Sequence, residues 1–311
     1  MPKYTMRDGQ EMNVIEIGRG EPVVLLHGLA LDATSWLPYA STSLLNKRFY
    51  IPDLRGWGKS RHMEISEDFY FGQLADDVHD LIQKIGAPKV ALVGISMGAC
   101  VGLEYLKRHG DSMLSRYLHI DHPAHLDRDI NPDALPPGLV DTGMAMIEEA
   151  RYFDPKTSIA QLPASYLHKH FQLIFGVLRN SFKRPWHKAV VLSLEYNPIA
   201  RKTMSEYTSA GCWYATLRAV QAAASGEFDV RAGLPDITIP VTNLVGTHDT
   251  LFPLGELKAV STLLPNCKTI EFHESGHLLM ITEIPKFLKV FRAFLAENEH
   301  GDSYQFPQQG D

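Results

Sequence analysis

Cysteine is scarce in this chain of 311 residues. The three cysteines, Cys100, Cys212 and Cys267, are widely spaced and form no Cys-x-x-Cys pair. An odd number without paired spacing argues against a disulfide framework and against a cysteine zinc site. We therefore expect three reduced, buried side chains.

Long apolar runs and an excess of basic charge are missing as well. No segment is apolar for the roughly 20 residues that span a bilayer, and the first eight residues lack the apolar core of a secretory signal. The formal net charge is −6, with acids and bases interspersed, so no basic stripe offers a site for nucleic acid. We expect a cytoplasmic protein that binds neither membranes nor nucleic acid; the sequence leaves open whether it is a monomer or a homo-oligomer.

Two segments look like cofactor or metal sites but lack the required spacing. Residues 53–60 are rich in glycine and carry Lys59, yet they match neither a P-loop nor the G-x-G-x-x-G dinucleotide pattern. We interpret them as a structural loop. Three histidines and Asp121 crowd into residues 119–125, but the further ligands of a binuclear metallohydrolase are absent. We predict no cofactor and no metal, with His119 in the core and His122 in a pocket wall.

Short apolar runs alternate with amphipathic segments along most of the chain. This alternation predicts a parallel sheet with helices on both faces. The expected strands are residues 12–17 (an edge strand), 22–26, 49–51, 89–93, 117–120, 241–245 and 269–272. The expected helices are residues 36–45, 74–85, 97–109, 254–264 and 284–297; the second of these places Asp76, Asp77 and Asp80 opposite its apolar side and closes at Gly86.

The pattern changes between residues 122 and 235, where many prolines divide the chain into short pieces without strand alternation. We predict a mainly helical cap over residues 122–235, inserted into a core formed by residues 1–121 and 236–298, with a mobile tail at residues 299–311. Aromatic residues in this region either line a substrate pocket or form the core of the cap, and the sequence leaves both open: Trp186, Tyr196, Tyr207, Trp213 and Tyr214.

The pentapeptide Gly94-Ile95-Ser96-Met97-Gly98 is the most informative feature of the chain. It follows an apolar run and precedes a helix-forming stretch, which gives the strand, sharp turn and helix of a nucleophile elbow. The elbow exposes the serine hydroxyl on a strained turn, and both flanking glycines avoid a clash. A candidate acid and a candidate base follow in the order Ser, Asp, His.

Five short segments, in their order along the chain, resemble motifs of the α/β-hydrolase superfamily. The resemblance is to its serine-nucleophile branch, which contains esterases and carbon-carbon hydrolases with a helical cap. The five segments are residues 27–28, 53–60, 94–98, 246–249 and 275–277. The resemblance covers nearly the whole chain outside the cap, and it implies an α/β fold with a mostly parallel central sheet flanked by helices.

The same resemblance implies a role for each site residue. Ser96 is the expected nucleophile. Because an imidazole must take the proton of its hydroxyl, we assign the role of base to His277. A carboxylate orients the imidazole; Asp249 is favoured, and Asp121 at the end of an earlier strand is the alternative. The amides of Met97 and Leu29 are the expected oxyanion donors. His27 is expected to bond to neighbouring backbone.

These assignments predict a serine-dependent hydrolase of a small carboxylic ester, or of a related lactone or thioester, acting through an acyl-enzyme on a small apolar acyl substrate. A carbon-carbon bond hydrolase of a vinylogous diketone is the alternative within the fold, although Ile95 replaces the asparagine associated with those elbows. Ser96 argues against dehalogenases and epoxide hydrolases, which use a carboxylate nucleophile. An inactive ligand-binding relative is the alternative of a different class.

Overall fold

A central sheet organises the chain in a computed structural model that describes residues 3–66, 69–126, 137–197, 199 and 212–297. Within these residues eight strands form one sheet in the order β1-β2-β4-β3-β5-β6-β7-β8. β1 pairs antiparallel with β2 and β2 with β4, whereas all the other pairs are parallel. The strands are β1 (Lys3–Thr5), β2 (Glu11–Gly18), β3 (Glu21–Leu26), β4 (Lys47–Pro52), β5 (Val90–Ile95), β6 (Leu114–Ile120), β7 (Val241–Gly246) and β8 (Cys267–Phe272).

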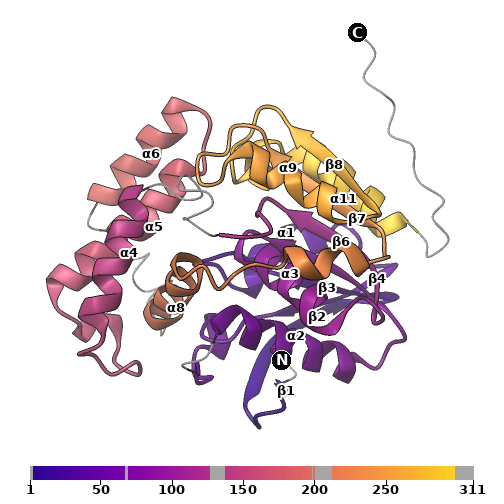
Figure 1. Ribbon diagram of the computed structural model, residues 1–311, viewed down its shortest axis with the longest axis horizontal. Helices are drawn as coiled ribbons and strands as arrows, with labels where there is room; N and C mark the ends of the chain where they lie inside the picture. Colours follow the sequence, from indigo (N-terminus) through magenta and orange to yellow (C-terminus); the bar gives the residue numbers. More distant parts are fainter. Residues whose placement is uncertain (1–2, 67–68, 127–136, 198, 200–211, 298–311) are drawn as a thin grey trace.

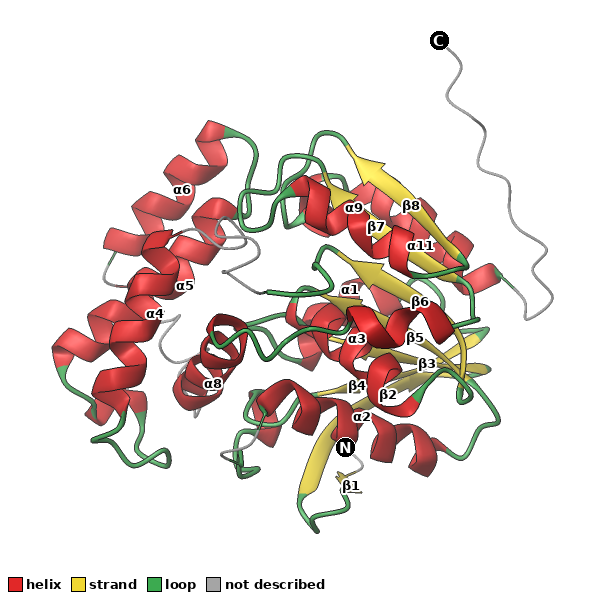
Figure 2. Cartoon of the chain, viewed as in Figure 1, coloured by secondary structure: helices red, strands yellow, loops and turns green. Residues whose placement is uncertain are grey.

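Helices cover both faces of the sheet (Figure 2), which explains why its central strands are continuous apolar runs. Every residue of β5 and of β6 is buried. Side chains from α2 (Tyr70–Ile85), α3 (Met97–His109) and α9 (Leu254–Leu263) pack in one core on the first face. Side chains from η1 (Ala33–Trp36), α1 (Leu37–Ala40), α10 (Leu279–Thr282) and α11 (Ile284–Ala296) pack in a second core on the other face. The mostly parallel α/β architecture is confirmed.

A helical cap lies beside the sheet, at the left of Figure 1, as the proline-rich pattern predicts. It contains α4 (Pro137–Ala150), η3 (Ile159–Gln161), α5 (Ala164–Asn180), α6 (Pro185–Tyr196) and α8 (Cys212–Ala224), and η4 (Arg231–Asp236) leads back to β7. Phe153, Tyr166 and Trp213 contact one another edge to face and form a separate cap core. The division at residues 122 and 235 stays a prediction, and the tail lies outside the described residues.

Two local predictions were wrong. β2 is not an edge strand, because the short β1 pairs with it and takes the edge. The helix expected over residues 36–45 is a single short turn, α1, after which the chain turns toward β4. The predicted amphipathic helix is present as α2, and on it Asp77 and Asp80 are buried, at 3% and 6% exposure, because Arg55 and Arg7 bind them.

The loop at residues 53–60 is structural, as expected. Asp53 accepts hydrogen bonds from the Asn13 side chain and from the backbone amides of Ala33 and Lys59, each at 2.8 Å. Arg55, only 1% exposed, binds both carboxylate oxygens of Asp77 at 2.7 Å. These bonds tie the loop to β2, η1 and α2, so its polar groups are engaged within the protein.

The remaining expectations from composition are partly met. Cys100 is buried and Cys267 half-buried, and both are free thiols, while the side chain of Cys212 lies outside the described residues. Across the described residues we find no helix with the length and apolar character needed to cross a bilayer.

Candidate active site

Ser96 stands on a strained turn between β5 and α3. Its backbone has φ 51° and ψ −120°, a region that side-chain-bearing residues rarely adopt. The flanking glycines are required by close backbone approach: a Cβ on Gly94 would lie 2.3 Å from the carbonyl oxygen of Gly98, and one on Gly98 would lie 2.4 Å from that of Leu26. The nucleophile-elbow geometry expected of this pentapeptide is therefore present.

Backbone strain is concentrated around this turn. Among the described residues other than glycine, Ala30, Ser96 and Asp121 have positive φ angles, of 58°, 51° and 57°. They follow β3, β5 and β6, which are neighbours in the sheet. Because parallel strands end at one edge, the three strained residues meet at the edge where open α/β sheets bind ligands.

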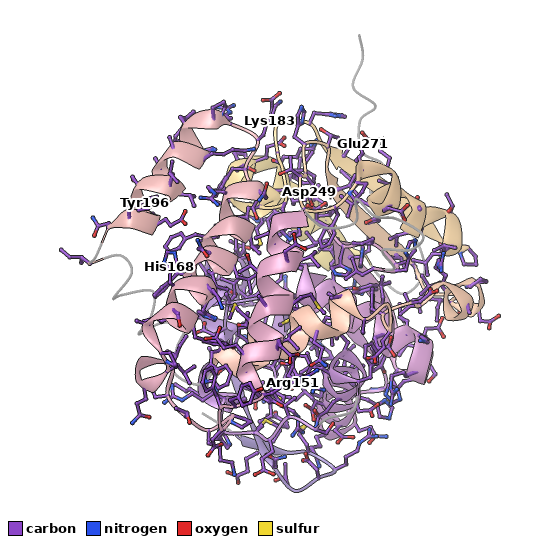
Figure 3. All side chains as sticks on the ribbon, turned by 60° about the vertical axis from the view of Figure 1, so that its left-hand side comes forward. Arg151, His168, Lys183, Tyr196, Asp249 and Glu271 are labelled. Atoms are coloured by element: carbon purple, nitrogen blue, oxygen red, sulfur yellow. The ribbon has the colours of Figure 1, made fainter. Side chains whose placement is uncertain are left out.

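Loops from the end of the chain bring His277 and Asp249 to Ser96. Nε2 of His277 lies 2.8 Å from Oγ of Ser96, and its Nδ1 lies 2.9 Å from Oδ2 of Asp249. His277 follows β8, and Asp249 lies three residues beyond β7. Figure 3 shows Asp249 where the core approaches the cap, whereas Tyr196 lies on the outer part of α6. The three residues predicted from sequence form one continuous line of hydrogen bonds.

Asp121 joins the same cluster, so the structure brings both candidate acids to the imidazole. Its Oδ2 lies 3.3 Å from Nδ1 of His277, and its Oδ1 accepts a hydrogen bond from the amide of Gly246 at 3.0 Å. The side chains of Asp121 and Asp249 have no exposed surface. Nδ1 of His277 therefore faces two buried carboxylates, with the shorter contact to Asp249.

Burial and charge perturb the protonation of this cluster. Burial by itself would lower the pKa of His277, but the charges of Asp249 and Asp121 and their hydrogen bonds outweigh burial and raise it. The pKa of Asp121 is raised, first by burial and next by the like charge of Asp249, against the opposing effect of His277. The imidazolium is therefore the stabilised form of His277.

Two backbone amides at the site have no acceptor within the described chain. Met97 is the first residue of α3, so its amide has no intrahelical partner. The amide of Leu29 precedes the strained Ala30 and makes no hydrogen bond with another described residue. Both residues line the pocket that contains Ser96. Their positions fit the expected pair of oxyanion donors.

An apolar pocket opens beside Ser96 between the sheet edge and the cap. It encloses about 760 Å³ between protein atoms, including open solvent at its mouth. Helices α4, α5 and α8 contribute aliphatic side chains, among them Leu139, Leu173 and Val220. Among the described lining residues, all are hydrophobic except Ser96 and His122. The described wall thus offers no charged group to a substrate.

His27, His119 and His125 each have a structural partner. Nδ1 of His27 donates to the carbonyl of Gly28, and its Nε2 accepts from the amide of Leu54, as expected for a residue that holds backbone. His119 binds the carbonyl of His122, and Nε2 of His125 lies 3.0 Å from Glu256. These nitrogens point to separate partners, so they do not form a shared metal site.

The described aromatic residues of the cap do not line the substrate pocket, which was one of the two hypotheses for them. Trp213 is buried in the cap core, while Trp186 and Tyr196 are 58% and 72% exposed, and none of these three, nor Tyr214, lines the pocket. Tyr207 lies outside the described residues. The aromatic lining instead comes from residues that sequence reasoning missed: Phe71 on α2 and Phe252 in the loop after Asp249. The proximity of Phe252 to Asp249 in sequence is the signal that could have found it.

Comparison with known sequences gives the family. The sequence model of the α/β-hydrolase fold matches residues 21–284 of the chain. The chain belongs to this family. The match spans the sheet from β3 through β8 together with the cap, so it includes every residue of the cluster described above.

The individual proteins that the chain resembles share a third or less of their aligned residues with it. A pimeloyl-[acyl-carrier protein] methyl ester esterase of Vibrio vulnificus is 24% identical over 89% of this chain and 95% of its own length. A non-heme chloroperoxidase, CPO-A1, of Kitasatospora aureofaciens is 32% identical, but the match covers 45% of this chain and about half (52%) of that protein. The structure of an esterase from Exiguobacterium antarcticum superposes with a TM-score of 0.70 at 24% identity, covering 95% of this chain and 99% of that one, which establishes the shared fold.

Proposed function

We propose that the protein is a serine-dependent hydrolase of small carboxylic esters or related acyl substrates, such as lactones and thioesters. The observation that carries the proposal is the unbroken line of hydrogen bonds from Asp249 through His277 to Ser96, which lines an apolar pocket. The family and its ester-cleaving relatives support a hydrolase of ester type. The residue roles below are our assignment.

In the first half of the reaction, Oγ of Ser96 attacks the ester carbonyl while Nε2 of His277 takes its proton. The carbonyl π electrons move to oxygen, and the amides of Met97 and Leu29 stabilise that negative charge. When the tetrahedral intermediate collapses, the carbon-oxygen bond to the alcohol breaks, and Nε2 gives the proton to the departing alkoxide. The product is an alcohol and an acyl group bound to Ser96.

Water completes the cycle by the same route. Nε2 of His277 takes a proton from water as its oxygen attacks the acyl carbon, and the proton returns to Oγ of Ser96 when the acid leaves. Asp249 accepts the hydrogen bond from Nδ1–H throughout, and with Asp121 it stabilises the imidazolium that forms in each half. No step needs a metal or an organic cofactor.

The pocket wall supports a small, neutral and mainly apolar acyl group as the substrate. Aliphatic side chains from three cap helices and Phe71 and Phe252 from the core would contact it. Burying an unpaired charge against such a wall is costly, so anionic groups are expected to remain at the mouth.

Labelling with a fluorophosphonate tests the nucleophile directly. The native protein is expected to be labelled at Ser96 and to hydrolyse p-nitrophenyl butyrate, and Ser96→Ala is expected to lose both properties while keeping its melting temperature. Ser41→Ala is the matched control, because Ser41 is exposed and its hydroxyl bonds only to a local carbonyl. Full turnover by Ser96→Ala, or labelling at another serine, would overturn the assignment.

A further inference from the structure

His122 is the polar exception in the described pocket wall besides Ser96. It follows Asp121 directly at the end of β6, and it is 4% exposed. The catalytic steps proposed above do not use it. A buried polar group on a hydrophobic wall needs a partner, so its hydrogen bonds show what it can offer to a substrate.

The hydrogen bonds of the ring assign its proton. Nδ1 of His122 lies 2.8 Å from the carbonyl oxygen of Pro123, and because a carbonyl only accepts, Nδ1 carries the hydrogen. Burial lowers the pKa of His122 to about 3, so the imidazole is neutral in ordinary buffers and carries one proton only. Nε2 is therefore an unprotonated acceptor.

That acceptor is free within the described chain and open to the pocket. Nε2 of His122 bonds to no other described residue. Nε2 of His122 also keeps accessible surface, unlike the two unpaired ring nitrogens of His170 in the cap, which are fully buried. Because the side chain lines the pocket that contains Ser96, the open lone pair is presented to the substrate space.

The ring is held in this orientation from several sides. It contacts Phe228 and Phe252 edge to face, with centroids 5.4 Å and 5.0 Å away. Its own carbonyl accepts a hydrogen bond of 2.6 Å from Nε2 of His119. Phe252 contacts the ring of His277 as well, at 5.5 Å, so one aromatic ring separates His122 from the proposed base. An acceptor fixed this way loses little entropy when it binds.

We propose that Nε2 of His122 is a specificity-determining acceptor that selects acyl groups carrying a neutral hydroxyl or amide N–H donor near the scissile carbonyl. The proposal rests on the proposed ester hydrolysis and names its substrate class. An acyl group with such a donor satisfies the lone pair, whereas a hydrocarbon isostere displaces solvent from it without replacing the hydrogen bond.

Two matched pairs of p-nitrophenyl esters test the proposal. 3-Hydroxybutanoate is compared with 3-methylbutanoate, and N-acetylglycinate with 4-oxopentanoate; each pair differs by one donor at nearly constant shape. We expect the native protein to favour the donor-bearing ester by roughly twofold to tenfold in kcat/KM for at least one pair, the range of one net hydrogen bond. The pair that responds distinguishes a hydroxyl donor from an amide donor.

Variants then assign the preference to His122. His122→Phe keeps an aromatic ring beside Phe228 and Phe252 but has no acceptor, so its ratio is expected to fall to about one while the isostere is still hydrolysed. His122→Gln carries an acceptor oxygen and is expected to recover part of the preference. Leu173→Met, on the same wall, is expected to keep the native ratio.

A native ratio of one or below for both pairs overturns the proposal, as does a native ratio retained by His122→Phe. If His122→Phe does not fold, His122→Leu replaces it in the same comparison. Failure of the underlying function is distinguishable, because in that case the native protein hydrolyses none of the four esters and Ser96 is not labelled by the fluorophosphonate.

Discussion

Replacing Asp121 with asparagine should move the pH dependence of the enzyme toward acid. In the proposed mechanism His277 takes the proton of Ser96 only when its imidazole is neutral, so kcat/KM should rise with pH through the pKa of that group in the free enzyme. Although burial alone would lower that pKa, the charges of Asp249 and Asp121 raise it. Removing one of these charges destabilises the imidazolium, and the acidic limb of the profile shifts to lower pH.

The size of the shift follows from one distance. Unit charges 3.3 Å apart, as for Oδ2 of Asp121 and Nδ1 of His277, interact by about 1.3 kcal/mol at the dielectric constant of water and by about 5 kcal/mol at an effective value of about 20. These energies correspond to about one and about four pKa units. Burial and Asp249 raise the pKa of Asp121 itself, so it carries only part of its charge near neutrality. We therefore expect a shift of about one pH unit.

Asparagine is a close structural match for this test. Its side-chain oxygen can keep the bond to the amide of Gly246, and its NH₂ group then faces Nδ1–H of His277, which disfavours the imidazolium further. Hydrolysis of p-nitrophenyl butyrate between pH 5 and pH 10 gives the profile for native enzyme and variant. The plateau value of kcat is expected to fall by less than about tenfold, because Asp249 still orients the ring.

Asp249→Ala is the informative comparison. It removes the 2.9 Å bond to Nδ1, and Asp121 becomes the remaining acceptor for that hydrogen. The loss in kcat should therefore stay below the roughly 10⁴-fold typical of a triad without its acid, and the double variant with Asp121→Asn should reach it. An acidic limb that stays in place or moves toward alkaline pH in Asp121→Asn would refute the electrostatic reasoning.

Three further changes probe the elbow, the core and the pocket. Gly98→Ala should lower kcat/KM by more than about 100-fold, because its Cβ would lie 2.4 Å from a backbone carbonyl of β3, whereas Gly255→Ala on α9 has open space and should leave activity unchanged; ester assays of both variants check this. Arg55→Met leaves Asp77 buried without its partner and should cost about 3–5 kcal/mol in urea unfolding, and a loss below 1 kcal/mol would contradict it. Ala223→Leu should shift the optimum of a p-nitrophenyl ester series toward shorter acyl chains; an unchanged optimum would place the acyl group elsewhere.

Much of the fold could be predicted because it depends on local patterns. The runs at β5 and β6 are apolar throughout, since both faces of those strands are covered, and Gly86 ends α2 with φ 70°, as its position after the periodic segment implies. Features that depend on distant partners could not be predicted. Nothing near the aspartates of α2 announces that Arg7, 73 residues away from Asp80, and Arg55 bury them.

The candidate site also has features that the sequence could predict and features that it could not. Motif order was enough to select Ser96, Asp249 and His277, because the elbow and the loops after β7 and β8 have fixed places in the sheet. Sequence treated Asp121 and Asp249 as alternatives, since it contains no information on side-chain distances. It also could not identify the pocket wall, because α4, α5 and α8 are brought over Ser96 by packing within the cap.

The strained turns at Ser96 and Asp121 explain how the Asp121 carboxylate joins the cluster. Ser96 directly follows β5, and Asp121 directly follows the neighbouring parallel strand β6. Both residues have a positive φ angle, a conformation that costs of order 1–3 kcal/mol per residue. Backbone ladder bonds continue through both turns: the amide of Ser96 donates to the carbonyl of Ile120, and that of Asp121 to Leu244, each at 2.9 Å. The sheet thus holds the two turns rigidly, and the strain directs the Ser96 hydroxyl and the Asp121 carboxylate toward the one imidazole that reaches them.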